Sequence, residues 1–254
     1  MVKVLLIGDS CLDEYIYCTT SRFCPDAPVP ILKPNSFVST LGMAGNVKDN
    51  LESLGVEVEL ISNSNKIKKT RYVDSKTNHM FIRIDEGEDD VLPIPYEALI
   101  KEIKFDYFDA VVISDYDKGF IDRATIKHIS QKHPLTFLDT KKELGDWAKD
   151  ITFIKINEVE SQASKGFLEM ADKSWSKRVI STLGSKGASY NGINYPVDEV
   201  DIKDTSGAGD TFMAGLVYAY ITERNVCNAI KFANKCSTQV VQKKGTAKIS
   251  ILET

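Results

Sequence analysis

Apolar residues along the chain gather in short, nearly continuous runs that alternate with stretches of helical periodicity. Runs without polar alternation are typical of parallel strands that are covered on both faces. Helices between such strands favour βαβ crossovers, so the pattern predicts an α/β fold with a mostly parallel central sheet. The predicted strands are residues 2–8, 56–62, 109–114, 135–139, 152–157 and 178–182, and the predicted helices are residues 43–54, 95–103, 122–132, 158–165, 207–222 and 226–243.

Two stretches interrupt this rhythm. Residues 13–40 and residues 70–85 alternate between apolar and polar positions with no helix between them, which indicates extended strands. We expect them to form a small β-sheet inserted in the α/β core. Such a sheet can act as a lid, because α/β folds bind ligands at the carboxyl ends of their strands.

Composition bounds the possible functions. The chain has 254 residues, 43% of them hydrophobic, and a net charge of −4, so we expect one domain over residues 1–254 and no attraction to nucleic acid or to anionic membranes. The first residues lack the basic leader and cleavage site of a signal peptide, and no apolar run is long enough to span a membrane. The five cysteines show no CxxC spacing, which favours reduced thiols and a cytoplasmic location.

One motif carries specific chemistry. The stretch "KDTSGAGDTFMAGL", residues 203–216, places a bare turn before a predicted helix. Glycines leave backbone amides unobstructed at a helix N-terminus, where anions bind. The sequence Gly207, Ala208 and Gly209 then leads to Asp210, which can accept a proton from a hydroxyl beside that anion site. The alternative is an ordinary helix start capped by Asp204 or Thr205.

The motif "DTSGAGDTFMAG" closely resembles the signature of the PfkB carbohydrate kinases, which have the ribokinase-like three-layer fold. The resemblance implies that Asp210 is the catalytic base and that residues 207–209 stabilise the transferred phosphoryl group. It also implies that Asp204 and Thr205 lie beside the phosphates of ATP. No Walker motif GxxxxGK[ST] is present, so a Walker P-loop is not available, and the absence of a GxSxG motif argues against a serine hydrolase.

The N-terminal half resembles the same family. "GDSCLDEYIY" matches its first strand and turn, which implies that Asp13 binds sugar hydroxyls. "LGMAGNVKDNLESLG" matches its glycine-rich signature, with Gly42 and Asn46 as substrate-binding positions. Met43 departs from the pattern, because the family usually has a second glycine there, and a side chain at this position would narrow the sugar pocket or shift the backbone. Without the resemblance, this stretch is also compatible with a simple helix start.

Two further segments resemble the family's ATP and metal elements. "KINEVE" matches its N-x-x-E motif, which implies that Asn157 and Glu160 face one cavity and that Glu160 holds Mg²⁺ through water. The alternative is an Asn N-cap followed by a surface glutamate. "STLGSKGASYN", otherwise a plain hairpin turn, and "FANKCSTQVVQKKGTA" resemble the nucleotide-binding loops. The implied ATP-binding residues there are Thr182, Gly184, Gly187, Asn234 and Ser237, with Gly245 near the base.

Within the family, the chain is most similar to the kinase domain of bifunctional heptose enzymes, which phosphorylates D-glycero-D-manno-heptose 7-phosphate at O1. The similar segments are "TSRFCPDAPVPILK", "SDYDKGF" and "RYVDSKTNHMFIRID". They make Arg71 and Arg83 candidates for binding a substrate phosphate, with exposed surface charges as the alternative, and Lys118 is open to the same two interpretations. The family's βα unit of roughly 30 residues after Ser62 is missing here.

The resemblance therefore predicts an ATP- and Mg²⁺-dependent kinase of a sugar or sugar phosphate. Two alternatives stay open, a non-catalytic relative that binds sugar or nucleotide, and a kinase of another alcohol such as a nucleoside. We expect a homodimer formed through the lid, since its uncovered edge strands invite pairing.

Overall fold

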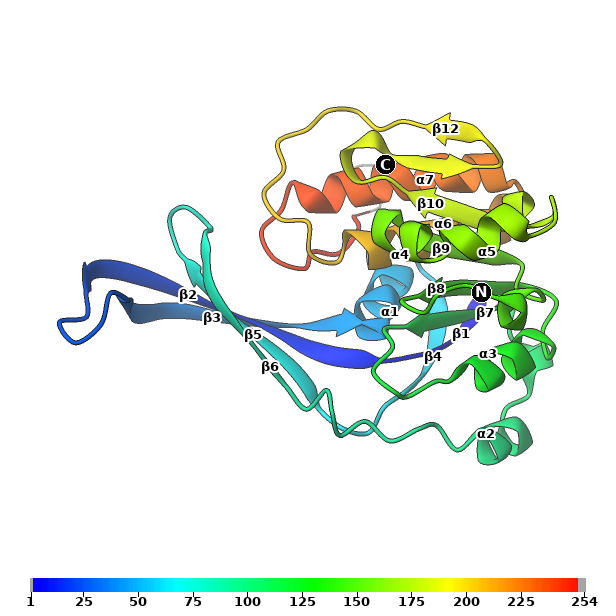
Figure 1. Cartoon of the computed structure of the whole chain (residues 1–254), viewed down its shortest axis with the longest axis horizontal. Helices are drawn as coiled ribbons and strands as arrows, with labels where there is room; N and C mark the ends of the chain where they lie inside the picture. The colour runs from blue at the N-terminus through cyan, green and yellow to red at the C-terminus, as the bar shows by residue number, and fades with distance from the viewer. Residues whose placement is uncertain (1, 251–254) are drawn as a thin grey trace.

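The computed structural model describes residues 2–250, with the backbone alone for residues 98–100. Its centre is an eight-stranded sheet in the order β12-β11-β10-β9-β8-β7-β1-β4, parallel except at β11 and β12 (Figure 1). The predicted parallel sheet is confirmed. Its strands are β1 (Lys3–Gly8), β4 (Glu57–Ser62), β7 (Ala110–Asp115), β8 (Thr136–Thr140), β9 (Phe153–Asn157), β10 (Val179–Thr182), β11 (Ala188–Tyr190) and β12 (Ile193–Tyr195).

Helices cover both faces of this sheet, because the continuously apolar strands send alternate side chains into two cores. Val4 and Leu6 of β1 join one core, and Leu5 and Ile7 join the other. The first core packs under α1 (Ala44–Ser53), α6 (Ala208–Glu223) and α7 (Val226–Val241). The second packs under α2 (Tyr96–Glu102), α3 (Arg123–Ser130) and α5 (Lys165–Met170), and the short helix α4 (Glu158–Ala163) follows β9 directly. Within residues 2–250, no helix combines the length and apolar character needed to cross a membrane.

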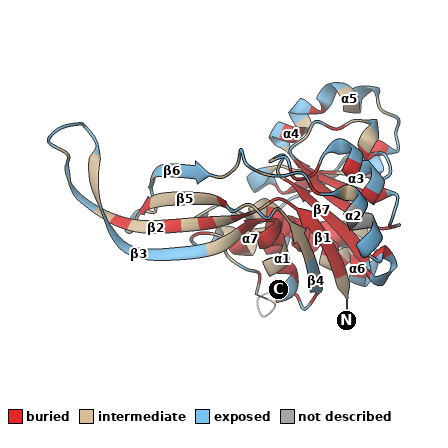
Figure 2. Cartoon of the chain, turned by 90° about the horizontal axis from the view of Figure 1, so that it is seen from below, coloured by how far each residue is buried: buried red, intermediate tan, exposed pale blue. Residues whose placement is uncertain are grey.

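A second sheet, which we call the lid, projects from the body as a long arm (Figures 1 and 2). Its four strands lie in the order β3-β2-β5-β6, with bounds β2 (Ser10–Phe23), β3 (Pro30–Met43), β5 (Ile67–Asp74) and β6 (Met80–Glu86). Both segments predicted to leave the core are therefore strands of one sheet. Strand β2 follows β1 after Asp9 alone, so the lid grows directly out of the central sheet.

The missing βα unit is visible as a short connection. Strand β4 ends at Ser62, and residues 63–66 lead straight into β5 of the lid. The Asn63 side chain holds this connection, because its Oδ1 accepts from the Ser10 amide at 2.7 Å and its Nδ2 donates to the Ser10 carbonyl at 3.2 Å. As a result β4 is an edge strand of the central sheet.

The edge hairpin β11–β12 and helix α5 were not predicted. The hairpin turns at Asn191 and Gly192, both with positive φ (49° and 76°), which is the turn chemistry that two-residue hairpins prefer. Of residues 194–203, only Asn194 and Tyr195 join β12. Pro196 ends the strand, since proline has no amide to donate to a ladder.

Candidate active site

A cavity of about 790 Å³ opens at the carboxyl ends of β9 and β10, beside the N-terminus of α6. This is the position at which α/β sheets bind ligands. Most of the positions predicted to bind nucleotide and phosphate line it, together with Lys141 and Lys155. The predicted positions that line it are Asn157, Thr182, Gly184, Gly187, Thr205, Gly207, Ala208, Gly209, Asn234 and Ser237.

The turn that begins α6 has no room for side chains. Gly207 adopts φ +76°, and a Cβ there would lie 2.5 Å from Nδ2 of Asn46. A Cβ on Gly209 would lie 2.9 Å from Nζ of Lys155. Both contacts are too close for a real carbon atom, so the two glycines make space for specific polar side chains.

Asp204 does not cap α6, whose N-cap is Gly207 without a side-chain hydrogen bond. Instead its Oδ1 accepts from the Ser206 amide at 2.8 Å, and its Oδ2 accepts from the Gly245 amide at 3.1 Å. Asp204 therefore fixes the shape of the turn and joins it to the chain after α7. The interpretation of this stretch as an ordinary capped helix start is wrong.

Asp210 lies buried in the first turn of α6, with both carboxylate oxygens held. Tyr116 Oη donates to Oδ1 at 2.5 Å, and Asn46 Nδ2 donates to Oδ2 at 3.0 Å. Burial raises the pKa of Asp210 to about 6, although these two hydrogen bonds act to lower it. The result is an oriented carboxylate whose pKa lies near neutral pH, as a general base requires.

Sequence reasoning missed Tyr116 and assigned Asn46 only to substrate. Tyr116 directly follows β7, and its amide donates to Oδ2 of the buried Asp9 at 2.7 Å. The sequence did indicate Tyr116 as a candidate site residue, because it belongs to the "SDYDKGF" segment at the carboxyl end of a parallel strand, where functional residues gather. Its contact with Asp210, 94 positions along the chain, could not be derived from the local pattern.

Two lid residues predicted to bind substrate, Asp13 and Arg71, lie together outside the lining of this cavity. Asp13 is buried and forms an ion pair with Arg71, whose guanidinium also lies 5.1 Å from the centre of the Tyr15 ring. Gly42 makes this arrangement possible, since a Cβ there would lie 2.3 Å from Oδ2 of Asp13. Arg83 is not brought to Asp13; its side chain is 46% exposed and pairs with Asp85 at 2.9 Å.

Met43 occupies a strained position between β3 and α1. It has φ 57° and ψ −132°, a region that residues other than glycine rarely adopt, at a cost of about 1–3 kcal/mol. Its buried side chain clusters with Cys11 and Ile67, and Tyr116 packs against this cluster. The backbone thus keeps a conformation suited to the family's glycine, while the methionine side chain fills space beside the site.

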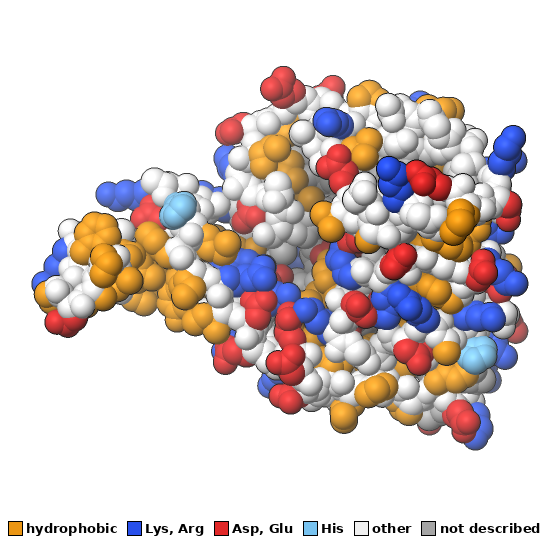
Figure 3. Space-filling view, viewed as in Figure 1, with side chains coloured by type: hydrophobic (Ala, Val, Ile, Leu, Met, Phe, Trp, Pro, Cys, Tyr) orange, Lys and Arg blue, Asp and Glu red, His pale blue; other side chains and the backbone are white. Residues whose placement is uncertain are grey.

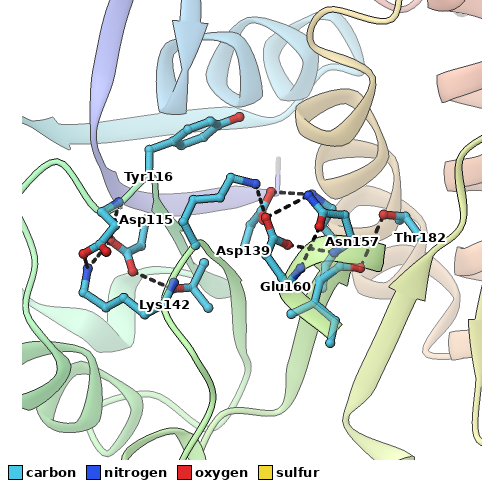
Figure 4. A network of polar contacts seen from close by, with 12 residues as sticks. Asp115, Tyr116, Asp139, Lys142, Asn157, Glu160 and Thr182 are labelled. Carbon is cyan, nitrogen blue, oxygen red and sulfur yellow. Dashed lines mark hydrogen bonds and ion pairs between the residues drawn. The ribbon is translucent and has the colours of Figure 1, made fainter. Parts of the chain in front are cut away.

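The predicted metal residues form a capping box. Asn157 Oδ1 accepts from the Glu160 amide at 2.9 Å, and Glu160 Oε2 accepts from the Asn157 amide at 2.7 Å. Glu160 Oε1 accepts from Asn157 Nδ2 and pairs with Lys141, so both oxygens are occupied (Figure 4). The Asn cap is therefore present, but the glutamate is buried rather than at the surface. Across the described chain, no group of three metal-binding side chains gathers.

Comparison with known proteins gives a consistent result. A family model described as pfkB family carbohydrate kinase matches residues 33–252. The bifunctional protein HldE of Nitratiruptor sp. is 27% identical over 303 residues, covering 99% of this chain and 64% of that protein. HldE of Helicobacter acinonychis is 29% identical, and the alignment covers 100% of this chain and 65% of that protein. The chain therefore spans about two thirds of these relatives, and the aligned length exceeds its own 254 residues because they contain segments that it lacks.

Solved structures show the same fold. Phosphofructokinase-2 from Escherichia coli superposes with a TM-score of 0.73 at 15% identity, covering 98% of this chain and 96% of that one. The nucleoside kinase of Methanocaldococcus jannaschii is described as an archaeal member of the ribokinase family. It superposes with a TM-score of 0.69 at 19% identity, covering 98% of this chain and 95% of that one. The predicted ribokinase-like architecture is confirmed.

The burial of Asp210 has a consequence for stability. Its folded pKa of about 6 exceeds the unfolded value of 3.8, so the folded state loses stability relative to the unfolded state as pH rises from about 4 to 6. Asp210→Asn removes this penalty. We expect it to raise the free energy of unfolding at pH 7.5 by on the order of 1–3 kcal/mol, and by much less at pH 4.

Urea denaturation at the two pH values measures this difference. Asp201→Asn, at an exposed position, serves as the control and should change little at either pH. An Asp210→Asn protein that is less stable than the wild type at pH 7.5 would contradict the prediction.

Proposed function

The chain belongs to the pfkB family of carbohydrate kinases, and we propose that it transfers the γ-phosphoryl group of ATP to a hydroxyl group of a sugar phosphate. The observation that carries this proposal is the position of Asp210, held by Tyr116 and Asn46 at the edge of a glycine-rich turn whose residues 207–209 line the cavity. A base and an anion site so close together suit phosphoryl transfer, which depends on positioning and electrostatics.

The proposed reaction uses these groups in order. Asp210 accepts the proton of the acceptor hydroxyl as its oxygen attacks the γ-phosphorus, and the bond between that phosphorus and the β–γ bridging oxygen breaks, leaving its electron pair on ADP. The amides of Gly207 and Gly209 stabilise the negative charge on the transferred group, at the positive N-terminal end of α6. The Ala208 amide donates to the Thr205 carbonyl at 3.2 Å and holds the turn in shape. Tyr116 and Asn46 keep the Asp210 carboxylate in one orientation during proton transfer.

We propose that ATP binds in the 790 Å³ cavity, whose volume is in the range of small-molecule sites. Ser237 of α7 donates to the Ala208 carbonyl at 2.9 Å, which joins this wall of the cavity to the turn. Asn234 of α7 donates to the Tyr195 carbonyl at 2.8 Å, which joins the same wall to β12. Mg²⁺ would neutralise charge on the ATP phosphates. The occupied oxygens of Glu160 favour a metal held mainly by phosphate and water, with Asn157 and Glu158 at the cavity wall.

For the acceptor, we propose a heptose 7-phosphate, phosphorylated at O1. The segments similar to the heptose kinase domain and the relatives named HldE support this assignment. Asp13 is suited to bind sugar hydroxyls, and Arg71 beside it is suited to a phosphate or to keeping Asp13 in place. Arg83 is less suited than Arg71 to bind the substrate phosphate, because its guanidinium pairs with Asp85.

A second candidate function is a non-catalytic relative that binds a sugar or nucleotide. The observation that favours it is the strained Met43 beside Tyr116, together with the shortened connection after Ser62. A kinase of another alcohol, such as a nucleoside, would use the same base and turn with a different lid surface.

We propose that two chains pair through the lid. Strand register places Phe37, Ile16, Tyr72 and Ile82 side by side across all four strands, on the face opposite Asp13 and Arg71. Phe37 is 58% and Ile82 53% exposed, and Figure 3 shows hydrophobic side chains gathered over the projecting arm. An exposed apolar face of this kind favours association with another chain.

Kinase activity can be measured as ADP release with a panel of acceptors, including D-glycero-D-manno-heptose 7-phosphate, hexose phosphates, free sugars and nucleosides. We expect the heptose phosphate to give the highest kcat/KM. Asp210→Asn should lower kcat by about 100-fold or more, because the general base is lost. Asp201→Asn, at an exposed position before the turn, should retain activity. Binding of ATP or sugar by calorimetry without turnover on any acceptor would instead support the non-catalytic relative.

The pH dependence of kcat/KM tests the contact between Tyr116 and Asp210. The wild type should lose activity below about pH 6, where Asp210 becomes protonated. Tyr116→Phe removes a hydrogen bond that stabilises the carboxylate, so the acidic limb should move upward by about one pH unit. Tyr190→Phe, which removes a tyrosine hydrogen bond to the Lys177 carbonyl far from the site, should leave the limb in place. An unmoved limb in Tyr116→Phe would exclude this role.

Assembly can be tested by sedimentation velocity. We expect a dimer for the wild type and a monomer for Phe37→Asp/Ile82→Asp, because two charges in the apolar row would be buried without partners. Leu92→Asp, which charges an exposed apolar residue outside the lid, should remain dimeric. A wild-type monomer at micromolar concentration, or a dimer that survives the double substitution, would rule out this interface.

A further inference from the structure

A buried ion pair lies directly beneath the turn of α6. Lys155 of β9 and Asp139 of β8 are neighbours in the strand register, with Nζ 2.8 Å from Oδ2. The two side chains are only 4% and 2% exposed. Figure 4 shows Asp139 between Tyr116 and the capping box of Asn157 and Glu160, in the polar network at the strand ends.

The pair is incompletely satisfied by protein groups. Within the described residues, Asp139 Oδ2 is the one hydrogen-bond acceptor of the Lys155 ammonium, which carries three donors. The other Asp139 oxygen, Oδ1, is buried and has no protein partner there. Removing two charges from water costs free energy that a single contact rarely recovers, so stability alone is a weak explanation for this pair.

The position of the Lys155 ammonium is also electrostatically unfavourable when no anion is bound. Nζ lies 2.9 Å from the position of a Cβ on Gly209, and Lys155 lines the cavity together with residues 207–209. The N-terminus of α6 has a partial positive charge, so a lysine beside it is repelled unless an anion binds both. Asp139 and the nearby Asp210 offset this repulsion in part.

We propose that Lys155 is a catalytic cation, whose ammonium contacts the phosphoryl group during transfer, and that Asp139 is its positioning residue. The inference rests on the proposed kinase function. In the step, the acceptor oxygen bonds to the γ-phosphorus, the bond to ADP breaks with its electron pair, and the hydroxyl proton passes to Asp210. Lys155 keeps its protons throughout and stabilises negative charge on the phosphoryl oxygens from below the turn.

Lys141 also lines the cavity, but its position is different. It pairs with Glu160 and lies 5.2 Å from the centre of the Tyr116 ring, with 32% of its side chain exposed. It is therefore suited to ATP phosphates nearer solvent. Lys155 is the cation placed against the bare turn itself.

Kinetics and binding of Lys155→Met test the proposal. We expect kcat to fall by about 100-fold or more while KM for ATP changes only a few-fold, because the contact strengthens during transfer. ADP alone should bind as in the wild type. ADP with aluminium fluoride, a mimic of the transferred phosphoryl group, should bind more tightly than ADP to the wild type and lose this advantage in Lys155→Met.

Two further variants separate catalysis from folding. Lys155→Met/Asp139→Asn removes both charges, so thermal unfolding should return toward the wild-type temperature while kcat stays low. Lys142→Met removes another ion-paired lysine, half-buried and paired with Asp115 at 2.7 Å outside the cavity lining, and should keep the aluminium fluoride advantage. Recovery of kcat in the double variant would show a structural pair and overturn the proposal.

The binding measurement also separates this inference from the proposed function. If the wild type phosphorylates no acceptor, the kinase proposal fails, but loss of the aluminium fluoride advantage in Lys155→Met would still support Lys155 as the phosphoryl-binding cation. The inference would be overturned if Lys155→Met still bound ADP with aluminium fluoride more tightly than ADP alone. It would also be overturned if the wild type showed no such difference in binding.

Discussion

The site depends on close packing at the first turn of α6, where side chains from two distant elements fill the space that two glycines leave. Asn46, from the helix that follows the lid, occupies the space beside Gly207, and Lys155, from the central sheet, occupies the space beside Gly209. The lid, the sheet and the helix are therefore fixed relative to one another at the position of Asp210. A methyl group at either glycine would push one of these polar side chains away.

This arrangement concentrates charge at a place where water is excluded. Asp210, Asp139, Lys155 and Glu160 are all buried within the same polar network at the carboxyl ends of the strands. Burial makes each interaction stronger and each unpaired atom more costly. Together with the backbone strain at Met43, this burial indicates that the edge of the sheet is not optimised for stability, as is common where function requires preorganised groups.

The sequence was sufficient to predict most of the fold, because continuous apolar strands and amphipathic helices are local patterns. It also predicted the turn before α6 with Asp210 in the first turn of that helix, because these residues adjoin in the chain, while the role of Asp210 stays a prediction. Tyr116 and the Lys155–Asp139 pair escaped, because their contacts depend on which strands become neighbours. Glu160 illustrates a different limit, since the N-x-x-E spacing suits a metal site and a capping box equally well, and only the geometry shows that both carboxylate oxygens are occupied.

The four strands of the lid form two faces, and these faces have different surroundings. Asp13 and Arg71 lie on one face, while the row from Phe37 to Ile82 lies on the opposite face. Because side chains alternate along a strand, inserting or deleting a single residue in β2 or β5 would exchange the two faces beyond that point. We infer that these strands tolerate substitutions far better than changes in length, so related chains should vary at the lid tip between β2 and β3 and keep a constant spacing from Asp13 to Ile16.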